Sequence, residues 1–249
     1  MVVRDTCPLC GSNRYKKNGH TRHGQQNHQC QTCGRPFTAN PLARRMAPEQ
    51  RLRIEQLWCE RLSLRGICRA VGVSLTWLLP FMVECLTACP DDLHAQLPAR
   101  PTAVVMSRLE AEADAMWSFG QKQANTQGIW IAMDATTRQI IALHVGDRSH
   151  ASGKELWAHI PMVYREQATF HTDQYAVYKG VIPAGQHRAI TKQARKTNHI
   201  ERFNNTLRQR VSRLVRETLS FSKKLTNHIG AIRFFICHYN LEKAAALPA

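Results

Sequence analysis

The chain has 249 residues, of which 43% are hydrophobic, and a net charge of +16 from 34 Lys and Arg against 18 Asp and Glu. This length suits one sizeable core with small accessory modules, and the excess of cations indicates a polyanionic partner such as a nucleic acid. A run of about 18 apolar residues is absent and residues 1–22 are charged throughout, so neither a membrane span nor a secretory signal is visible. We therefore expect a cytoplasmic protein with no membrane contact.

The distribution of this charge is more informative than its total. Residues 1–40 carry 6 basic and 1 acidic side chains, residues 41–100 carry 8 and 6, and residues 188–249 carry 13 and 3. Residues 101–187 carry 7 basic and 8 acidic side chains, so the middle of the chain is slightly acidic. This pattern predicts a carboxylate site flanked by two segments that bind nucleic acid.

Two pairs of cysteines near the amino terminus have the spacing of a metal site. Cys7 and Cys10 form one pair, Cys30 and Cys33 form the other, and a glycine directly follows each pair. Two such knuckles close one tetrahedral Zn²⁺ site, and four thiolate ligands leave no open position for a substrate. Nine cysteines without an export signal argue against a disulfide framework. We predict a zinc ribbon whose metal is structural.

Residues 41–95 are predicted to be helical. A linker leads into an amphipathic helix that starts near Pro48 and buries Ile54, Leu57 and Trp58. A second helix ends before a turn at residues 72–74, and a third begins at residue 75. Two helices joined by a short turn with glycine form the helix-turn-helix pattern, whose second helix lies in a major groove of DNA. Pro80 is expected to kink or stop this second helix after one turn.

A Pro- and Asp-rich boundary at residues 90–101 separates this region from a segment of extended pattern. The predicted strands are residues 110–119, 127–133, 138–145, 168–172 and 187–190. The predicted helices are residues 151–166, a short one that begins at Tyr175, and 192–216. Short loops make the first three strands antiparallel neighbours. The order predicts an α/β fold with a mixed sheet and helices packed on it.

The helix predicted over residues 192–216 places one carboxylate among many cations. Its apolar positions recur at helical spacing and are Ile200, Phe203, Leu207, Val211 and Leu214. Glu201 is the only acid in this segment. A carboxylate beside arginines suits a site that holds a metal and handles phosphates. The same glutamate also follows Asn198 by three residues, which is a helix-start capping pattern.

Three acids come from different predicted elements and can converge on one site. Asp114 lies on the first predicted strand, Asp173 at the carboxyl end of the fourth, and Glu201 on the helix. Three carboxylates are what two Mg²⁺ ions need for displacement at a phosphodiester. Asp173 also suits a turn or a helix N-cap. Asp134 is a rival for Asp114, but its position is one that a hairpin loop would use.

Five segments of the chain resemble the transposases of the IS1 insertion-sequence family. They are residues 112–119, 146–149, 171–178, 199–210 and 218–223. The resemblance implies an RNase H-like domain at residues 101–249, preceded by a zinc ribbon at 1–40 and a helix-turn-helix region at 41–95. It also implies a DDE active site carried by Asp114, Asp173 and Glu201, which would use Mg²⁺ or Mn²⁺ to make 3′-OH ends and join them to target DNA.

The partner implied by the resemblance is double-stranded DNA, both the element ends and the target, bound by a homo-oligomer associated with the nucleoid. His199 and Arg202 flank Glu201 and either contact the scissile phosphate or face solvent. A further set of cations is predicted to follow the phosphate backbone: Arg208, Arg210, Arg213, Arg216, Lys223 and Lys224. Asp147 and Arg148 are compatible with a simple surface ion pair.

Two other functions fit the residues. A zinc-ribbon and helix-turn-helix regulator would bind DNA without catalysis, and its carboxyl-terminal domain would be structural. A nuclease of the same fold would hydrolyse DNA but not join it. Three acids favour an enzyme over a regulator, whereas joining and hydrolysis are not separated by the sequence.

Overall fold

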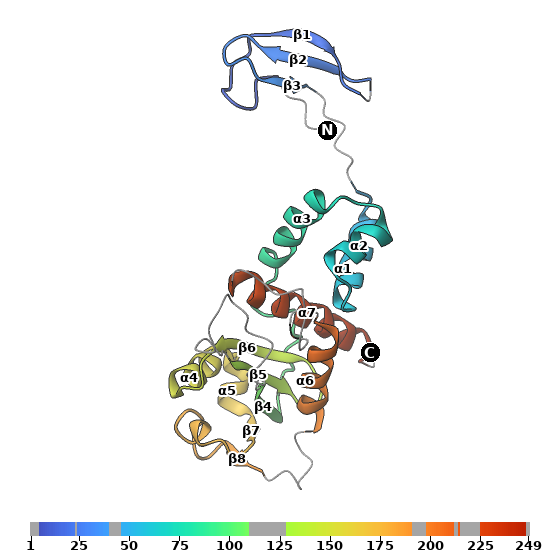
Figure 1. The fold of residues 1–249 in the computed structure, drawn as a ribbon. Helices are drawn as coiled ribbons and strands as arrows, with labels where there is room; N and C mark the ends of the chain where they lie inside the picture. Colours follow the sequence, from blue (N-terminus) through green and yellow to red (C-terminus); the bar gives the residue numbers. More distant parts are fainter. Residues whose placement is uncertain are drawn as a thin grey trace. The chain divides into compact units, whose positions relative to one another are not determined.

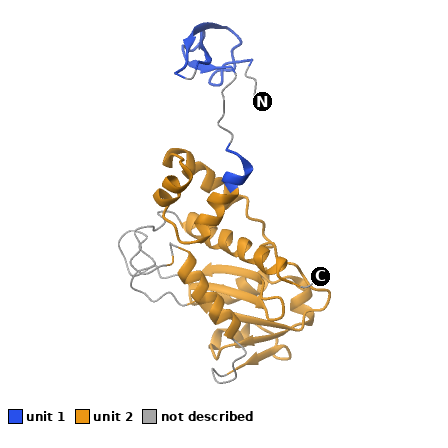
Figure 2. Ribbon diagram, turned by 90° about the vertical axis from the view of Figure 1, so that its right-hand side faces the viewer, with its two compact units in different colours: residues 1–51 blue, residues 52–249 orange. Residues whose placement is uncertain are grey.

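The computed structural model describes residues 5–22, 24–39, 46–109, 128–190, 198–211, 214 and 225–247. The chain divides into two compact units, residues 1–51 and residues 52–249 (Figures 1 and 2).

The first unit is a small antiparallel sheet. Its strands are β1 (Tyr15–His20), β2 (Gln26–Cys30) and β3 (Pro36–Thr38), in that spatial order. Its core is Cys7, Cys30 and Phe37, with the Tyr15 ring packed edge-on against Phe37 at 5.3 Å. So small an apolar core stabilises the unit little by itself, which fits a unit that relies on metal ligands.

Three helices follow: α1 (Pro48–Cys59), α2 (Leu64–Val71) and α3 (Leu75–Thr87). Ser63 and Ser74 cap α2 and α3, since their hydroxyls accept from the backbone N–H groups of Gly66 and Trp77. Gly72 ends α2 with a φ of 72°, a left-handed conformation that glycine adopts without strain. The α2–α3 pair is bent by 112°. The predicted helix, turn and helix are therefore present.

Pro80 was predicted to kink or stop α3, but the helix does not stop there, because it runs on to Thr87. Proline removes one backbone N–H and crowds the carbonyl one turn earlier. This local cost is offset by the burial of Leu78, Phe81 and Met82, which bracket the proline. The packing of a helix thus overrides a single unfavourable residue.

The second unit contains a five-stranded mixed sheet with the order β6-β5-β4-β7-β8. The strands are β4 (Ala103–Leu109), β5 (Gly128–Asp134), β6 (Ile140–Gly146), β7 (Thr169–Thr172) and β8 (His187–Ala189). β4, β5 and β6 are antiparallel neighbours, whereas β7 is parallel to β4, and β8 to β7. This confirms the predicted mixed α/β architecture.

The strand that pairs with β5 is not the predicted one. It is β4, which starts at Ala103 and pairs from Val104↔Asp134 to Leu109↔Ile129. The strand predicted over residues 110–119 lies outside the described residues. Both faces of β4 are covered, so its sequence lacks the polar–apolar alternation that marks a half-exposed strand.

The helices that follow β6 in this unit cover both faces of the sheet (Figure 1). They are α4 (His150–His159), α5 (Met162–Gln167), α6 (Asn198–Arg210) and α7 (Leu225–Ala245), with a short 3-10 helix η2 (Ala176–Gly180). The structure has two helices where a single one was predicted over residues 151–166, because the helical conformation is interrupted at Ile160 and Pro161. The helix predicted to begin at Tyr175 is the 3-10 helix.

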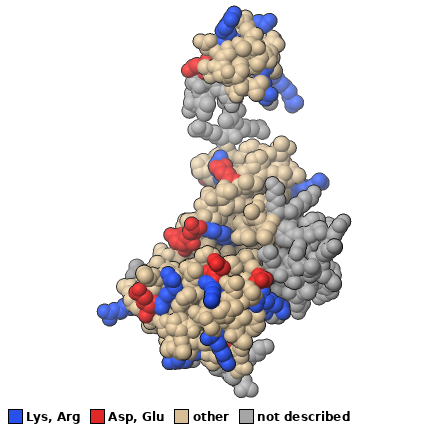
Figure 3. Space-filling model, turned by 90° about the vertical axis from the view of Figure 1, so that its left-hand side faces the viewer, with Lys and Arg blue, Asp and Glu red and all other residues tan. Residues whose placement is uncertain are grey.

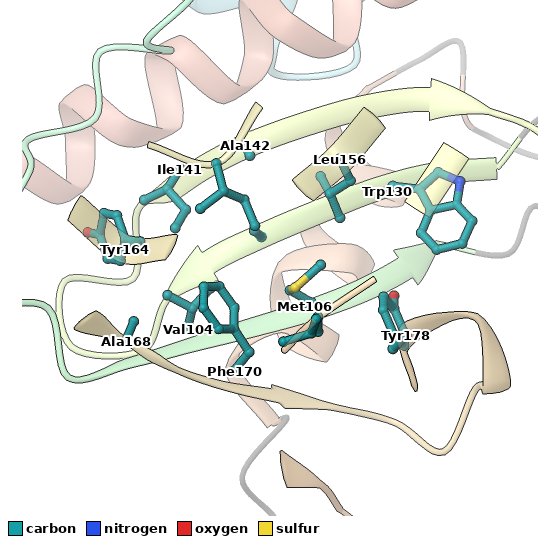
Figure 4. Packing of buried hydrophobic residues seen from close by; sticks show 13 residues of the cluster. Val104, Met106, Trp130, Ile141, Ala142, Leu156, Tyr164, Ala168, Phe170 and Tyr178 are labelled. Atoms are coloured by element: carbon teal, nitrogen blue, oxygen red, sulfur yellow. The ribbon is translucent and has the colours of Figure 1, made fainter. Parts of the chain in front are cut away.

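The main core lies between the sheet and helices α4 and α5. Val104 and Met106 of β4, Trp130 of β5 and Phe170 of β7 meet Leu156 of α4 there (Figure 4). On the other face, α6 buries its predicted stripe at Ile200, Phe203 and Leu207, and Val211 and Leu214 beyond its end are buried too. This confirms the predicted apolar face of α6.

Among the described helices, none alone has the length and hydropathy of a membrane span, and only the bent pair α2–α3 meets both criteria together.

Candidate functional site

The four predicted zinc ligands lie together in the first unit. The sulfurs of Cys7 and Cys33 are 3.6 Å apart, as are those of Cys10 and Cys30, and all four lie within 4.8 Å of one another. Tetrahedral zinc with bonds of about 2.3 Å needs sulfurs separated by about 3.8 Å, so the donors fit. The backbone N–H of Cys33 helps to lower the pKa of Cys30, whereas that of Cys10 is raised by its cysteine neighbours, so the support for a metal site comes from the positions of the four sulfurs.

The second unit has a distinct edge at which several strands end. The β4–β5 and β5–β6 registers bring Leu109 of β4, Gly128 of β5 and Gly146 of β6 to the same edge. β7 runs parallel to β4 and ends at the same side of the sheet. We call this the carboxyl edge of the sheet. Residues that follow β6 and β7 therefore lie near one another, as ligands do at such edges, and the Tyr175 hydroxyl indeed bonds the Arg148 carbonyl.

Asp173 directly follows β7 at the carboxyl edge. It is exposed, and its Oδ1 accepts a hydrogen bond of 3.1 Å from the backbone N–H of Tyr175. The turn anticipated for this aspartate is thus present. A carboxylate has two oxygens with two lone pairs each, so one hydrogen bond leaves capacity for a metal ion.

Tyr178 is packed beneath this turn and is fully buried. Burial first, and then the charge of Asp173, raises its pKa above the ordinary value. Its hydroxyl has no hydrogen-bond partner among the described residues. A neutral phenol therefore lies near the Asp173 carboxylate, and the sequence analysis gave Tyr178 no role beyond its place in the segment 171–178.

Glu201 is exposed and lies in the first turn of α6. One turn later, α6 makes a hydrogen bond to the central strand β4. The Asn204 amide nitrogen donates to the Ser107 hydroxyl of β4 at 2.9 Å. The β4–β7 register pairs Val105 with His171, so Ser107 is level with Asp173 when that register is continued. The elements carrying Asp173 and Glu201 therefore both contact β4: β7 pairs with it from Ala103 to Val105, and α6 bonds Ser107.

The third expected carboxylate, Asp114, lies outside the described residues. Its rival Asp134 belongs to the opposite edge of the sheet, where β5 ends. Asp134 is 2% exposed and accepts from the backbone N–H groups of Thr136 and Thr137 and from the Tyr164 hydroxyl. It closes the β5–β6 hairpin, as its position in the sequence indicated.

The residues predicted to contact phosphates differ in their surroundings. His199 accepts from the Arg138 guanidinium at 2.7 Å, and burial first, with the charges of Arg138 and Arg202, lowers its pKa. Arg210 donates to Glu60 and to the Cys59 carbonyl and also lies 3.6 Å from Glu242. Arg202 is exposed and Arg208 is half-buried. The remaining four lie outside the described residues: Arg213, Arg216, Lys223 and Lys224.

The charge on the face of the larger unit that Figure 3 shows is mixed. Lys and Arg side chains are interspersed with Asp and Glu among the described residues of that face. Two further arginines, Arg108 and Arg148, belong to the carboxyl edge itself. Sequence reasoning did not assign Arg108, because only the observed start of β4 places it there.

The comparisons with known proteins agree with this architecture. The family model for the IS1 transposase domain matches residues 107–241. The iso-IS1n protein InsB of Shigella dysenteriae is 32% identical over 128 residues, which cover 51% of this chain and 94% of the relative. The IS1 protein InsB of Shigella flexneri is 31% identical over 131 residues, covering 52% and 96%.

The matched segment contains the carboxyl edge, α6 and most of α7, that is, the elements that carry Asp173 and Glu201. The chain therefore belongs to the IS1 transposase family, and its role is that of a transposase, a DNA-processing enzyme.

Proposed function

We propose that this chain cleaves DNA at the ends of its own insertion sequence and joins the resulting 3′-OH ends to target DNA. Residues 101–249 would form an RNase H-like catalytic domain, and Asp114, Asp173 and Glu201 would hold the divalent metal ions. The observation that carries the proposal is the position of Asp173 at the end of β7, beside the strand to which α6 is bonded through Asn204.

The donor chemistry of this edge supports a magnesium site. Asp173 and Glu201 are both exposed, and carboxylate oxygens are the ligands that Mg²⁺ or Mn²⁺ prefers. When bound, two such ions stabilise the entering and leaving oxygens of an in-line displacement at phosphorus. The chain itself would hold the carboxylates in place through the Tyr175 N–H on Asp173 and the Asn204 amide on β4.

The remaining parts would bind and align the DNA. The zinc ribbon at residues 1–40 and the helix-turn-helix region at 41–95 would contribute contacts outside the catalytic domain. His199, Arg202 and Arg208 of α6 would contact phosphates near the reacting bond, because they share a helix with Glu201. Joining two ends requires both to be held at once, which supports a homo-oligomer on DNA.

The test is cleavage and strand transfer with the Asp173→Asn variant. The substrate is a duplex that carries the gene's own flanking sequences, incubated with Mg²⁺ and a supercoiled target. We expect the wild type to produce nicked ends and joined products, and the variant to bind the duplex without either reaction. Cleavage by Asp173→Asn at the wild-type rate would remove this residue from the site.

The same experiment separates the other two functions. If the chain is a regulator, the wild type and Asp173→Asn would both bind the flanking DNA, and neither would cleave it. A nuclease would give nicked products without joined products. Glu166→Gln is a suitable control, because Glu166 is an exposed acid of α5, which precedes β7, and it has no part in the proposed site.

A further inference from the structure

The loop after β6 is held in one conformation at the carboxyl edge. Oδ1 of Asp147 accepts from the backbone N–H of Ser149 at 3.0 Å and from the Ser152 hydroxyl at 2.6 Å. Trp130 of the neighbouring strand donates its indole N–H to the Asp147 carbonyl at 3.0 Å. Arg148 lies between these anchored positions and has an exposed side chain. The loop therefore presents one arginine from a fixed backbone.

Tyr175 connects this loop to Asp173. Its hydroxyl donates to the Arg148 carbonyl at 2.9 Å, and its backbone N–H donates to Asp173 Oδ1 at 3.1 Å. A single residue thus links the backbone that carries Arg148 to the proposed metal ligand. The two segments are 27 residues apart in sequence.

A second arginine lies on the same tyrosine. The guanidinium carbon of Arg108, near the end of β4, is 4.5 Å from the centre of the Tyr175 ring and 5.7 Å from that of Trp130. Stacking on aromatic rings orients a guanidinium. Arg108 and Arg148 are therefore both positioned by Tyr175, two residues from Asp173.

We propose that Arg148, with Arg108 beside it, binds a phosphate of the DNA strand at the Asp173 site, and that Tyr175 is the residue that positions both arginines. This inference rests on the proposed function, because it places the scissile strand at the carboxyl edge. The ligand is a phosphodiester, whose paired oxygens match the fork of a guanidinium. The arginine places positive charge on one side of the carboxylate site. A phosphate of the DNA strand therefore binds beside the carboxylates.

The test uses the full chain and the flank duplex in two measurements. The first is binding in the absence of Mg²⁺ as a function of salt. Arg148→Ala should reduce the slope of log affinity against log salt by about 0.9, the value for one lost phosphate contact. Arg100→Ala is the matched control, because Arg100 is exposed and precedes β4, at the opposite edge of the sheet. Its salt slope should equal that of the wild type.

The second measurement is the single-turnover cleavage rate in Mg²⁺. Arg148→Ala should lower it by about 100-fold, the usual effect of losing one group that stabilises developing charge. Arg148→Lys should recover part of the rate, because lysine supplies the charge without the fork. Tyr175→Phe removes only the hydroxyl. It should lower the single-turnover cleavage rate at saturating DNA without changing the KM for the DNA in steady-state cleavage. That effect should vanish in an Arg148→Ala background.

The outcomes separate this inference from the proposed function. An unchanged salt slope for Arg148→Ala overturns the phosphate contact whether or not the wild type cleaves. A wild type that binds but does not cleave overturns the proposed function, while the salt slope still decides the contact. Replacing the phosphate at the cleavage point by a neutral methylphosphonate should abolish the difference in affinity between wild type and Arg148→Ala.

Discussion

The Asn204 amide nitrogen donates to the Ser107 hydroxyl at 2.9 Å and joins the helix of Glu201 to the central strand of the sheet. Asn204 is only 9% exposed, and its amide oxygen is buried without a partner among the described residues. The hydrogen bond made by this polar residue fixes the position of α6 along β4 more precisely than apolar packing alone would.

We therefore expect Asn204→Ala to destabilise the folded protein by about 1–2 kcal/mol, the usual range for a buried hydrogen bond. The measurement is the free energy of unfolding in urea. Asn205→Ala is the control, because Asn205 is the exposed neighbour, and its effect should stay within about 0.5 kcal/mol. Equal stability of Asn204→Ala and Asn205→Ala would contradict the role given to the Ser107 contact.

Arg210 and Arg208 should differ, although both were expected to contact DNA. Arg210 bonds the Cys59 carbonyl, pairs with Glu60 and stacks on Phe235, which links α6 to α1 and α7. Partial exposure screens the ion pairs, so we expect Arg210→Ala to cost about 1–2 kcal/mol of stability, mainly through lost packing and the carbonyl bond. Arg208→Ala should cost less stability than Arg210→Ala and should weaken DNA binding. Urea unfolding and salt-dependent binding of both variants measure this, and the reverse pattern would refute the division of roles.

Zinc should stabilise the first unit selectively. We expect Cys30→Ser to lose the bound zinc and to open residues 1–51 to protease, while the second unit keeps its cooperative unfolding, because its core has no share in the cysteine cluster. Metal content by mass spectrometry and limited proteolysis test this. Cys68→Ser is the control, since Cys68 lies on α2 outside the cluster and should retain one zinc per chain.

The stability should fall as the pH drops below about 6.5. Burial is the main cause that lowers the pKa of His144 and His238 from the ordinary value of 6.5. A lowered pKa means that the folded state takes up protons less readily than the unfolded state, so stability is complete above pH 6.5 and declines below it. Urea midpoints at pH 8, 7, 6 and 5.5 measure the decline. His238→Gln should flatten it, and a midpoint that rises toward pH 5.5 would show that the sign is wrong.

An element can be predicted from the sequence when one of its faces is buried and the other is exposed, because its apolar residues then recur at a regular spacing. The stripe of α6 at Ile200, Phe203 and Leu207 was identified because its other face is polar, and the structure buries all three. The Cys7–Cys33 cluster was identified because ligand spacing is itself the signal. Both cases depend on a spacing of residues that is recognisable in the sequence without knowledge of the fold.

The parts that were not predicted depend on register and on two-sided burial. β4 is buried or half-buried along its whole length and begins with an apolar run from Ala103 to Met106, so no polar–apolar alternation marked Ala103–Leu109 as a strand. Arg108 and Tyr175 lie 67 positions apart in the chain and meet only because β4 and β7 are parallel neighbours. Pairings of this kind follow from the sheet order, which no local pattern determines.

The most direct test of the account is Mg²⁺-dependent nicking of DNA carrying the gene's own flanks, comparing the wild type with Glu201→Gln and Glu166→Gln. Glu166 is an exposed acid of α5 and serves as the control. We predict nicks at the flank boundaries with the wild type and Glu166→Gln, and none with Glu201→Gln. Nicking by Glu201→Gln at the wild-type rate, or binding without nicking by any of the three proteins, would contradict a carboxylate active site in this chain.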